Sequence, residues 1–203
     1  MDANDWDRRY SASGLVWSAG PNRCVVEQVT GLPPGRALDL GAGEGRNAAW
    51  LATQGWQVSA VDFSAVGLAK GRRAAAQAGL QVDWVVADAA AYLAVPRAFD
   101  LVLLCYLQLP LPELRRLLTA AAAALAPGGT LLYLAHDRSN LEHGHGGPRD
   151  PAVLATPGEV AAALPGLAIE LAEVVRRPLD DDLGHRGGGG AVALDALVRA
   201  RRA

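Results

Sequence analysis

The chain has 203 residues, of which 51% are hydrophobic and 20% charged, with a formal net charge of -2. This length suits one domain, and the apolar fraction excludes a disordered chain. With 19 basic residues against 21 acidic ones there is no broad positive field, so neither a nucleic-acid partner nor an anionic membrane is expected.

Cysteine usage and hydropathy indicate the compartment. Cys24 and Cys105 are too few for a disulfide framework or a cysteine-rich zinc site, which favours a reducing environment. The N-terminus is acidic and no apolar run follows it, unlike a secretory signal. The longest apolar stretches, 101–107 and 117–126, are shorter than the roughly 18 residues of a membrane span. We therefore expect a cytoplasmic protein.

Short apolar runs alternate with Ala- and Leu-rich stretches through the middle of the chain. Runs this short and this apolar are typical of strands buried on both faces of a parallel sheet. Five such strands are predicted at 37–40, 57–61, 82–86, 101–105 and 130–134. Glycine and proline punctuation, with N-cap residues such as Ser64 and Thr156, predicts helices around them. These helices cover 23–30, 46–54, 64–78, 112–126 and 157–164.

The last third of the chain has a different pattern. Residues 136–155 are rich in glycine and proline and are predicted as a loop without regular structure. Two more strands, at about 167–175 and 191–199, are joined by a glycine-rich connection and should pair antiparallel, since no helix lies between them. The predicted fold class is α/β: a Rossmann-like, doubly wound sheet of seven mostly parallel strands, with the last strand antiparallel.

We expect a single domain over residues 1–203. Its parts are an N-terminal cap segment at 1–31, a cofactor-binding half at 36–135 and a substrate-side half at 136–203.

A glycine-rich loop between the first strand and the first crossover helix is the most informative motif. It reads Leu38-Asp39-Leu40-Gly41-Ala42-Gly43-Glu44-Gly45-Arg46-Asn47. Glycines allow the backbone to turn sharply and to approach a ligand, and open α/β sheets bind ligands at this edge. A dinucleotide fingerprint requires glycine at the sixth position from Gly41, where this chain has Arg46. Arg46 and Asn47 could still hold a phosphate, so an NAD-dependent oxidoreductase remains an alternative.

Two acids follow the next two strands. Asp62 ends the second strand, where a carboxylate can accept hydrogen bonds from both hydroxyls of a ribose. Asp88 follows the third strand, where a carboxylate can accept from an exocyclic amine such as adenine N6. Phe63 could pack on a base. The glycine loop and these two acids predict a nucleoside site.

In their order and spacing, these motifs resemble the class I S-adenosylmethionine (SAM)-dependent methyltransferases over residues 36–134, including Leu125-Ala126-Pro127-Gly128-Gly129-Thr130-Leu131. The chain is most similar to small bacterial enzymes of the tellurite-resistance and thiopurine methyltransferase type, whose Trp-Asp-x-x-Tyr segment is here Trp6–Tyr10.

The resemblance implies SAM as cofactor and assigns roles to individual positions. Asp39 would support the ammonium group beside the glycines, Asp62 would hold the ribose, and Asp88 with Ala89 would bind the adenine. The implied cofactor-binding residues are Asp39, Gly41, Ala42, Gly43, Arg46, Asn47, Asp62, Phe63, Asp88, Ala89, Cys105 and Trp17.

Aromatic residues and a cysteine near the expected site have plainer interpretations. Trp6, Tyr10 and Trp17 form either a cofactor lid or a cover for the sheet edge. Cys105 is more typical of a small buried hydrophobe than of a nucleophile, although it should lie beside the sulfonium with Tyr106.

All four histidines, His136, His143, His145 and His185, lie in segments that should leave the ligand-binding edge. We expect His136, His143, His145 and Tyr106 as catalytic candidates, a histidine acting as general base or orienting group. Two alternatives remain: solvated loop histidines, or a metal bound by His143-Gly144-His145 with His136 or Asp137. No metal is expected.

The predicted reaction is transfer of the SAM methyl group to an O, N or S atom of a small molecule, releasing S-adenosylhomocysteine (SAH). Short segments around the expected acceptor site suit a small acceptor. A non-catalytic SAM-binding protein is a further alternative to the enzyme. An exposed last strand would allow a homodimer.

Overall fold

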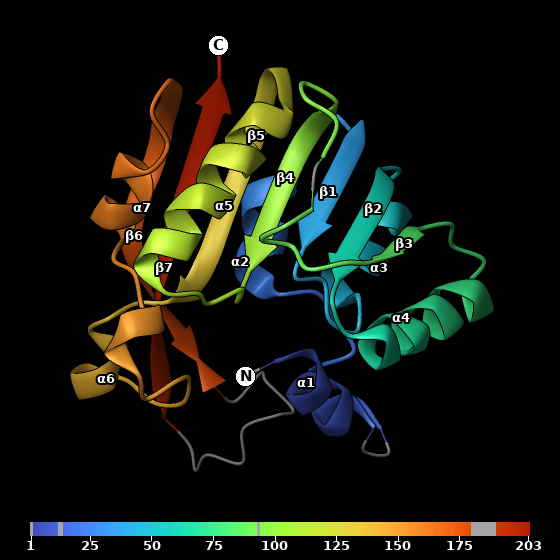
Figure 1. The fold of residues 1–203 in the computed structure, drawn as a ribbon, viewed down its shortest axis with the longest axis horizontal. Coiled ribbons are helices and arrows are strands. Elements are labelled where there is room, and N and C mark those ends of the chain that lie inside the picture. The colour runs from blue at the N-terminus through green and yellow to red at the C-terminus, as the bar shows by residue number, and fades with distance from the viewer. Residues whose placement is uncertain (1, 12–13, 93, 180–189) are drawn as a thin grey trace.

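Within the described residues, which are all except 1, 12–13, 93 and 180–189, strands form one seven-stranded sheet in the order β3-β2-β1-β4-β5-β7-β6 (Figure 1). The structure is a computed structural model. The strands are β1 (Arg36–Leu40), β2 (Gln57–Asp62), β3 (Asp83–Val86), β4 (Phe99–Cys105), β5 (Leu125–His136), β6 (Leu167–Pro178) and β7 (Val192–Arg202).

Strand directions confirm the predicted fold class. β7 runs antiparallel to both of its neighbours, β5 and β6, and every other neighbouring pair is parallel. The carboxyl ends of β1, β2, β4 and β5 therefore meet at one edge, which we call the carboxyl rim. Because β7 is antiparallel, its first residues lie at this same rim. Open α/β sheets bind their ligands there.

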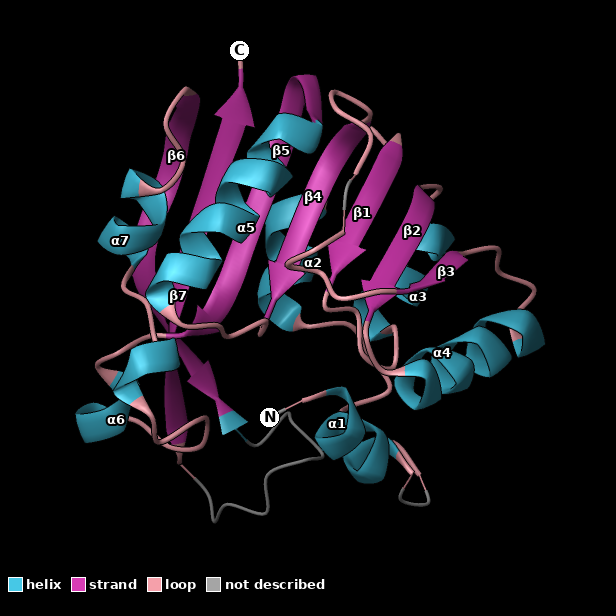
Figure 2. Ribbon diagram, in the orientation of Figure 1, coloured by secondary structure: helices cyan, strands magenta, loops and turns pink. Residues whose placement is uncertain are grey.

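Helices lie on both faces of the sheet and at its carboxyl rim (Figure 2). They are α1 (Ala3–Tyr10), α2 (Arg23–Val29), α3 (Arg46–Thr53), α4 (Ala65–Gln77), α5 (Leu111–Ala124), α6 (Asn140–His143) and α7 (Pro157–Ala162), with a 3-10 turn at Pro151–Val153. Figure 1 shows α5 and α7 in front of the sheet, α2 and α3 behind it, and α1 and α6 beyond the carboxyl rim. None of the helices in the described part of the chain has the length and apolarity that a membrane crossing requires.

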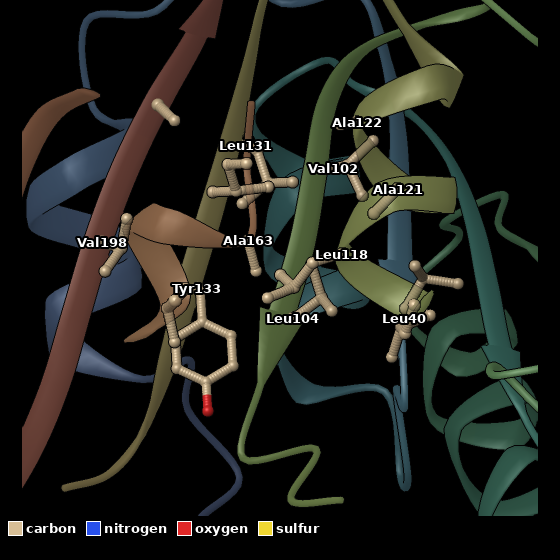
Figure 3. Packing of buried hydrophobic residues seen from close by; sticks show 14 of the residues in the cluster. Leu40, Val102, Leu104, Leu118, Ala121, Ala122, Leu131, Tyr133, Ala163 and Val198 are labelled. Carbon is tan, nitrogen blue, oxygen red and sulfur yellow. The ribbon is translucent and has the colours of Figure 1, made fainter. Parts of the chain in front are cut away.

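Two hydrophobic clusters fill the space on either side of the sheet. Leu118 of α5 is fully buried against β4 and β5, in a cluster that also contains Val102, Leu104 and Leu131 (Figure 3). On the opposite face, Val25 of α2 and Leu51 of α3 belong to the second cluster. Burial of both faces explains why the strand segments read as continuous apolar runs.

The N-terminal helix α1 was not predicted from the sequence. It is held by a capping box, in which Asp2 accepts from the backbone N–H of Asp5 while the Asp5 side chain accepts from the N–H of Asp2. The helix is short and mostly polar, its aromatic residues Trp6 and Tyr10 stack on each other, and it packs against α4. The predicted N-caps Ser64 and Thr156 are confirmed, and each accepts a backbone N–H three residues on.

Two boundary predictions were wrong. The fifth strand starts at Leu125 rather than at 130, because Leu125 already pairs with Phe99, and the Pro-Gly-Gly turn lies inside the strand as an irregularity before Thr130 pairs with Leu101. The helix before it consequently ends at Ala124. Residues 136–155 are not structureless either, since they contain α6 and the 3-10 turn.

Candidate functional site

The glycine loop connects β1 to α3 at the carboxyl rim. Gly41, Gly43 and Gly45 all have positive φ, at 76°, 57° and 73°, a conformation that side chains disfavour. The N–H groups of Gly41 and Ala42 both donate to the carbonyl of Val61, at 2.8 and 3.0 Å, which fixes the loop against β2. A Cβ atom on Gly43 would lie 2.6 Å from the Tyr10 hydroxyl. The loop therefore requires glycine, and the Tyr10 hydroxyl packs directly against it.

Asp39, two residues before the loop, is a buried carboxyl group with a backbone hydrogen bond from Ala48 and one free oxygen. It is 1% exposed, and its Oδ2 has no hydrogen-bond partner in the structure. Burial, and secondarily the nearby Asp62, raises the pKa of Asp39 to about 7. A buried acid with a free oxygen fits a cationic group such as the ammonium of SAM, so the residues present pass this test for the cofactor.

Asp62 ends β2 and is held by backbone donors. Its Oδ2 accepts from the N–H of Gly43 and its Oδ1 from the N–H of Ser64, both at 2.8 Å. Burial raises the pKa of Asp62, although these two N–H groups oppose the shift. A carboxylate has about four acceptor positions, so two remain for the hydroxyls of a ribose.

The predicted base-binding residues lie farther along the rim. Asp88 is exposed, and its Oδ1 accepts from the N–H of Ala90 at 2.9 Å. Ala89 is buried and Phe63 half-buried. These side chains can contribute one acceptor and apolar surface.

The N-terminal segment covers the glycine loop instead of the sheet edge. We call residues 3–22, apart from the undescribed 12 and 13, the cap. Trp6 stacks on Tyr10 with ring centroids 5.3 Å apart, and Trp17 donates from Nε1 to the Tyr10 hydroxyl at 3.3 Å. Arg9 lies over the rings of Trp6 and Trp17, at 5.2 and 5.1 Å.

Two acids that sequence reasoning missed hold the cap. Glu44, inside the glycine loop, accepts from the N–H groups of Val16 (2.9 Å) and Trp17 (3.2 Å) and pairs with Lys70 at 3.1 Å. Asp7 accepts from the Ser64 hydroxyl at the start of α4. An acid among the loop glycines was the available signal for Glu44, whereas the Trp-Asp-x-x-Tyr segment contains Asp7 without indicating its partner.

Arg46 and Asn47 contact the cap as well. Arg46 donates from Nη1 to the Ser18 hydroxyl at 2.8 Å, and the Asn47 Oδ1 accepts from the N–H of Asn22 at 2.9 Å. Asn47 is therefore engaged in joining the cap to α3, which weakens the alternative in which it grips a phosphate.

Cys105 and Tyr106 lie where β4 ends, on the far side of the glycine loop. Burial raises the pKa of the Cys105 thiol to about 12, so Cys105 is a neutral, half-buried group. Tyr106 has φ of 58°, an uncommon conformation for a bulky residue. Such backbone strain is concentrated at functional sites.

Four polar side chains meet where β4, β5, β6 and β7 lie side by side. We call them the His136 cluster: His136, Tyr106, Arg177 and Asp195. Asp195 is 0% exposed, and its Oδ2 accepts from the Tyr106 hydroxyl at 2.6 Å and from Arg177 Nε at 2.7 Å. Its Oδ1 lies 3.1 Å from His136 Nδ1. Arg177 and Asp195 were missed, because a single charged residue within a strand gives no sign of its partners.

The other histidines are not brought together with His136. His143, at the end of α6, and His145 are both exposed, and His143 lies 3.7 Å from the Glu142 carboxylate. His185 falls outside the described residues. Across the described chain, no three His, Cys, Asp or Glu side chains are grouped in a way that could hold a metal ion.

Comparison with known proteins gives matches to methyltransferases. A family model described as methyltransferase domain matches residues 37–129. Ubiquinone biosynthesis O-methyltransferase of Azoarcus sp. (strain BH72) is 31% identical over 110 residues, 54% of this chain and 47% of that protein. Ribosomal RNA small subunit methyltransferase C of Alcanivorax borkumensis is 31% identical over 118 residues, 51% of this chain and 33% of that protein. The chain thus spans a third to about half of the length of these relatives.

Solved structures share the fold over nearly the whole chain. A protein studied for the conversion of a disulfide bond into a thioacetal group during echinomycin biosynthesis superposes with a TM-score of 0.78 at 22% identity, covering 98% of this chain and 91% of that one. TehB from Haemophilus influenzae has a TM-score of 0.72 at 16% identity, covering 99% and 67%.

Residues 37–129 match a methyltransferase domain, and the fold of the whole chain is the one shared by the solved structures above. The likeness to TehB is a likeness of fold.

Proposed function

We propose that this protein transfers the methyl group of SAM to a small-molecule acceptor and releases SAH. The observation that carries the proposal is the buried Asp39 carboxyl group, whose Oδ2 has no partner, directly beneath a glycine loop and next to Asp62. Leaving a buried acceptor unpaired costs roughly 1–3 kcal/mol, which a bound cation would recover.

The cofactor residues divide by chemistry. Asp39 would hold the ammonium group, Asp62 the ribose hydroxyls, and Asp88 with Ala89 and Phe63 the adenine. Gly41, Ala42 and Gly43 would line the methionine portion, with Cys105 beside the sulfonium. SAM supplies the reactive methyl group when bound, and the protein mainly aligns acceptor and methyl group, an effect worth roughly 7–11 kcal/mol.

The cap supports a small acceptor. Tyr10 and Trp17 lie over the glycine loop, and Glu44 fastens the backbone of the cap above it. A site roofed in this way by residues of a single domain suits a small molecule better than a polymer. The net charge of -2 also favours a small molecule over nucleic acid, although one relative is a ribosomal RNA methyltransferase.

His136 is the histidine best placed for chemistry. It ends β5 at the carboxyl rim, is 6% exposed, and lies with its ring centroid 5.2 Å from that of Tyr106. We propose it as the general base and Tyr106 as a group beside the acceptor, while the exposed His143 and His145 would contribute less. The expectation of an exposed last strand was wrong, because β7 lies between β5 and β6. The homodimer and the cytoplasmic location remain predictions.

Calorimetry with SAH, SAM and NAD tests the cofactor. We expect SAH and SAM to bind and NAD not to bind, and Asp62→Ala to weaken SAH binding. NAD binding without SAH binding would instead favour the oxidoreductase. A screen of catechol, benzyl alcohol, thiophenol and aniline, read as SAH release, then tests catalysis. SAH binding with no release from any acceptor would favour the non-catalytic alternative.

A further inference from the structure

We infer that Asp195 is a positioning residue that holds the proton of His136 on Nδ1, so that Nε2 can take the proton of an acceptor hydroxyl group. This inference rests on the proposed methyl transfer and adds to it the class of acceptor, an alcohol or phenol that arrives protonated.

The sheet places the two side chains together. In the antiparallel pairing of β5 with β7, His136 and Asp195 are directly opposite residues, so their side chains emerge on the same face. His136 is 6% exposed and Asp195 0%. Nδ1 and Oδ1 approach within 3.1 Å, and neither atom forms an aligned hydrogen bond with any group in the structure. Each atom is thus available only to the other.

The second oxygen of Asp195 is fixed by two donors. Tyr106 donates its hydroxyl and Arg177 its Nε to Oδ2, and the Arg177 guanidinium lies 5.2 Å from the centroid of the Tyr106 ring. Burial opposes ionisation of Asp195, but its contacts with His136, Arg177 and Tyr106 outweigh this and lower its pKa. The carboxylate is consequently ionised and cannot rotate away from His136.

An ionised carboxylate facing Nδ1 selects one tautomer. The carboxylate accepts a hydrogen bond from a protonated Nδ1 and repels the lone pair of an unprotonated Nδ1. In the neutral ring the proton is therefore on Nδ1 and the free lone pair is on Nε2. Gly147 packs on that edge of the ring, where a Cβ atom would lie 2.9 Å from Nε2 and 2.6 Å from Cδ2. Only glycine leaves the backbone this close to the imidazole, and its φ of 76° suits glycine as well.

The charged groups around the ring come from each neighbouring element. Asp195 belongs to β7, Arg177 to β6, and Tyr106 directly follows β4. Cys24 of α2 also lies near this cluster, since Asp195 raises its pKa and Arg177 lowers it. Arg177 is matched by Asp195. The carboxylate therefore carries the charge nearest to Nδ1.

The step balances as follows. The acceptor hydroxyl gives its proton to Nε2 of His136 while its oxygen lone pair forms the bond to the methyl carbon. The carbon–sulfur bond breaks and its electron pair stays on sulfur, which leaves neutral SAH and a methyl ether. His136 is left as an imidazolium beside the Asp195 carboxylate and afterwards returns the proton to solvent. An ionised thiol would not need this base.

Asp195→Asn separates positioning from simple packing. The Oδ2 position receives two donors, so the asparagine carbonyl must occupy it and the NH2 group must face His136 Nδ1. That donor requires an unprotonated Nδ1, so the tautomer should reverse while the side-chain shape is retained. The matched control is Glu170→Gln, because Glu170 of β6 also accepts from an arginine, Arg199 Nε at 2.9 Å, but lies far from His136 in the sheet register.

The tautomer is measured by 15N NMR of the histidine side chains at pH 8 in the full chain, with the His136 signals assigned from His136→Gln. We expect protonated Nδ1 in the parent protein and in Glu170→Gln, and protonated Nε2 in Asp195→Asn. SAH binding within about threefold of the parent shows that the variant is folded. Protonated Nε2 in the parent, or no change in the folded variant, would overturn the inference and leave methyl transfer itself untouched.

The acceptor class is tested by SAH release. Catechol or benzyl alcohol should be methylated, and Asp195→Asn should slow that reaction about 100-fold, in the range of a lost general base, with little change in KM for SAM. Glu170→Gln should stay within twofold. Release from thiophenol alone, or equal rates in the parent and Asp195→Asn, would overturn the assignment of a protonated hydroxyl acceptor.

Discussion

His136 and Asp195 face each other across β5 and β7, with Nδ1 and Oδ1 3.1 Å apart at the carboxyl rim. They are 59 positions apart in the chain, from 136 to 195. The antiparallel last strand is what returns an acid to the edge where the parallel strands end. This arrangement puts a base and its partner on the opposite side of Tyr106 from the glycine loop.

Asp39 should make the stability of the ligand-free protein depend on pH. Its pKa is about 7 in the folded chain and about 3.9 in an unfolded one, so the folded state retains more protons between these values. Asp39 therefore lowers the free energy of unfolding as pH rises from about 4 to about 7, by up to about 4 kcal/mol. In Asp39→Asn this loss is absent, so the Tm of the variant relative to the parent should rise from pH 4 to pH 8. A difference in Tm that is constant with pH would contradict the prediction.

Asp62→Asn should weaken SAH binding. The variant loses the charge that we propose binds the ribose and one acceptor for the N–H groups of Gly43 and Ser64. A hydrogen bond to a charged group contributes roughly 1.5–3 kcal/mol, so the Kd should rise about 10- to 100-fold in calorimetry. Asp83→Asn, at an exposed carboxylate where β3 begins and away from the carboxyl rim, is the matched control and should change the Kd less. Equal effects of the two substitutions would argue against a ribose role for Asp62.

Glu44→Gln should loosen the cap. The carboxylate accepts from two cap N–H groups and pairs with Lys70, and its side chain is 4% exposed. We expect faster cleavage of the cap in limited proteolysis and a loss of about 1.5–3 kcal/mol in unfolding free energy. Glu27→Gln removes an exposed pair with Arg23 and should change stability by less than about 1 kcal/mol. If the cap of Glu44→Gln resisted proteolysis as well as the cap of the parent protein, a role of Glu44 in holding the cap would be refuted.

Leu118→Ala should destabilise the protein without changing the chemistry of the site. Leu118 is 0% exposed between α5 and the sheet, and truncating a buried leucine costs about 2–5 kcal/mol. Val174→Ala, at an edge-strand side chain that is 46% exposed, should cost less than about 1 kcal/mol. Urea denaturation followed by circular dichroism measures both. Similar midpoints for the two variants would show that this cluster does not govern stability.

The sequence by itself determined the sheet and the cofactor side of the site. Apolar runs bounded by glycine and proline identified the inner strands because both faces of the sheet are buried there, whereas the edge strands β3 and β6 are largely exposed. The motif from Asp39 to Asn47 is local, so its spacing is visible in one dimension. Asp62 could be found for the same reason, as the residue at which a strand ends. The ends of the strands were predicted less well than their existence. Leu125, for example, belongs to β5 only because it pairs with the distant Phe99.

Only the tertiary structure decided which residues lie above the glycine loop and which lie on the other side of Tyr106. No local pattern distinguishes Arg177 and Asp195 from other charged side chains, because their partners lie far along the chain. Local motifs contain Glu44 and Asp7, but only the tertiary structure shows which residues they hold. The separation of His136 from His143 and His145 likewise depends on register and on the path of the segment after β5. Local spacing sets which residues can turn, cap or end a strand, whereas strand order and register set which of them meet.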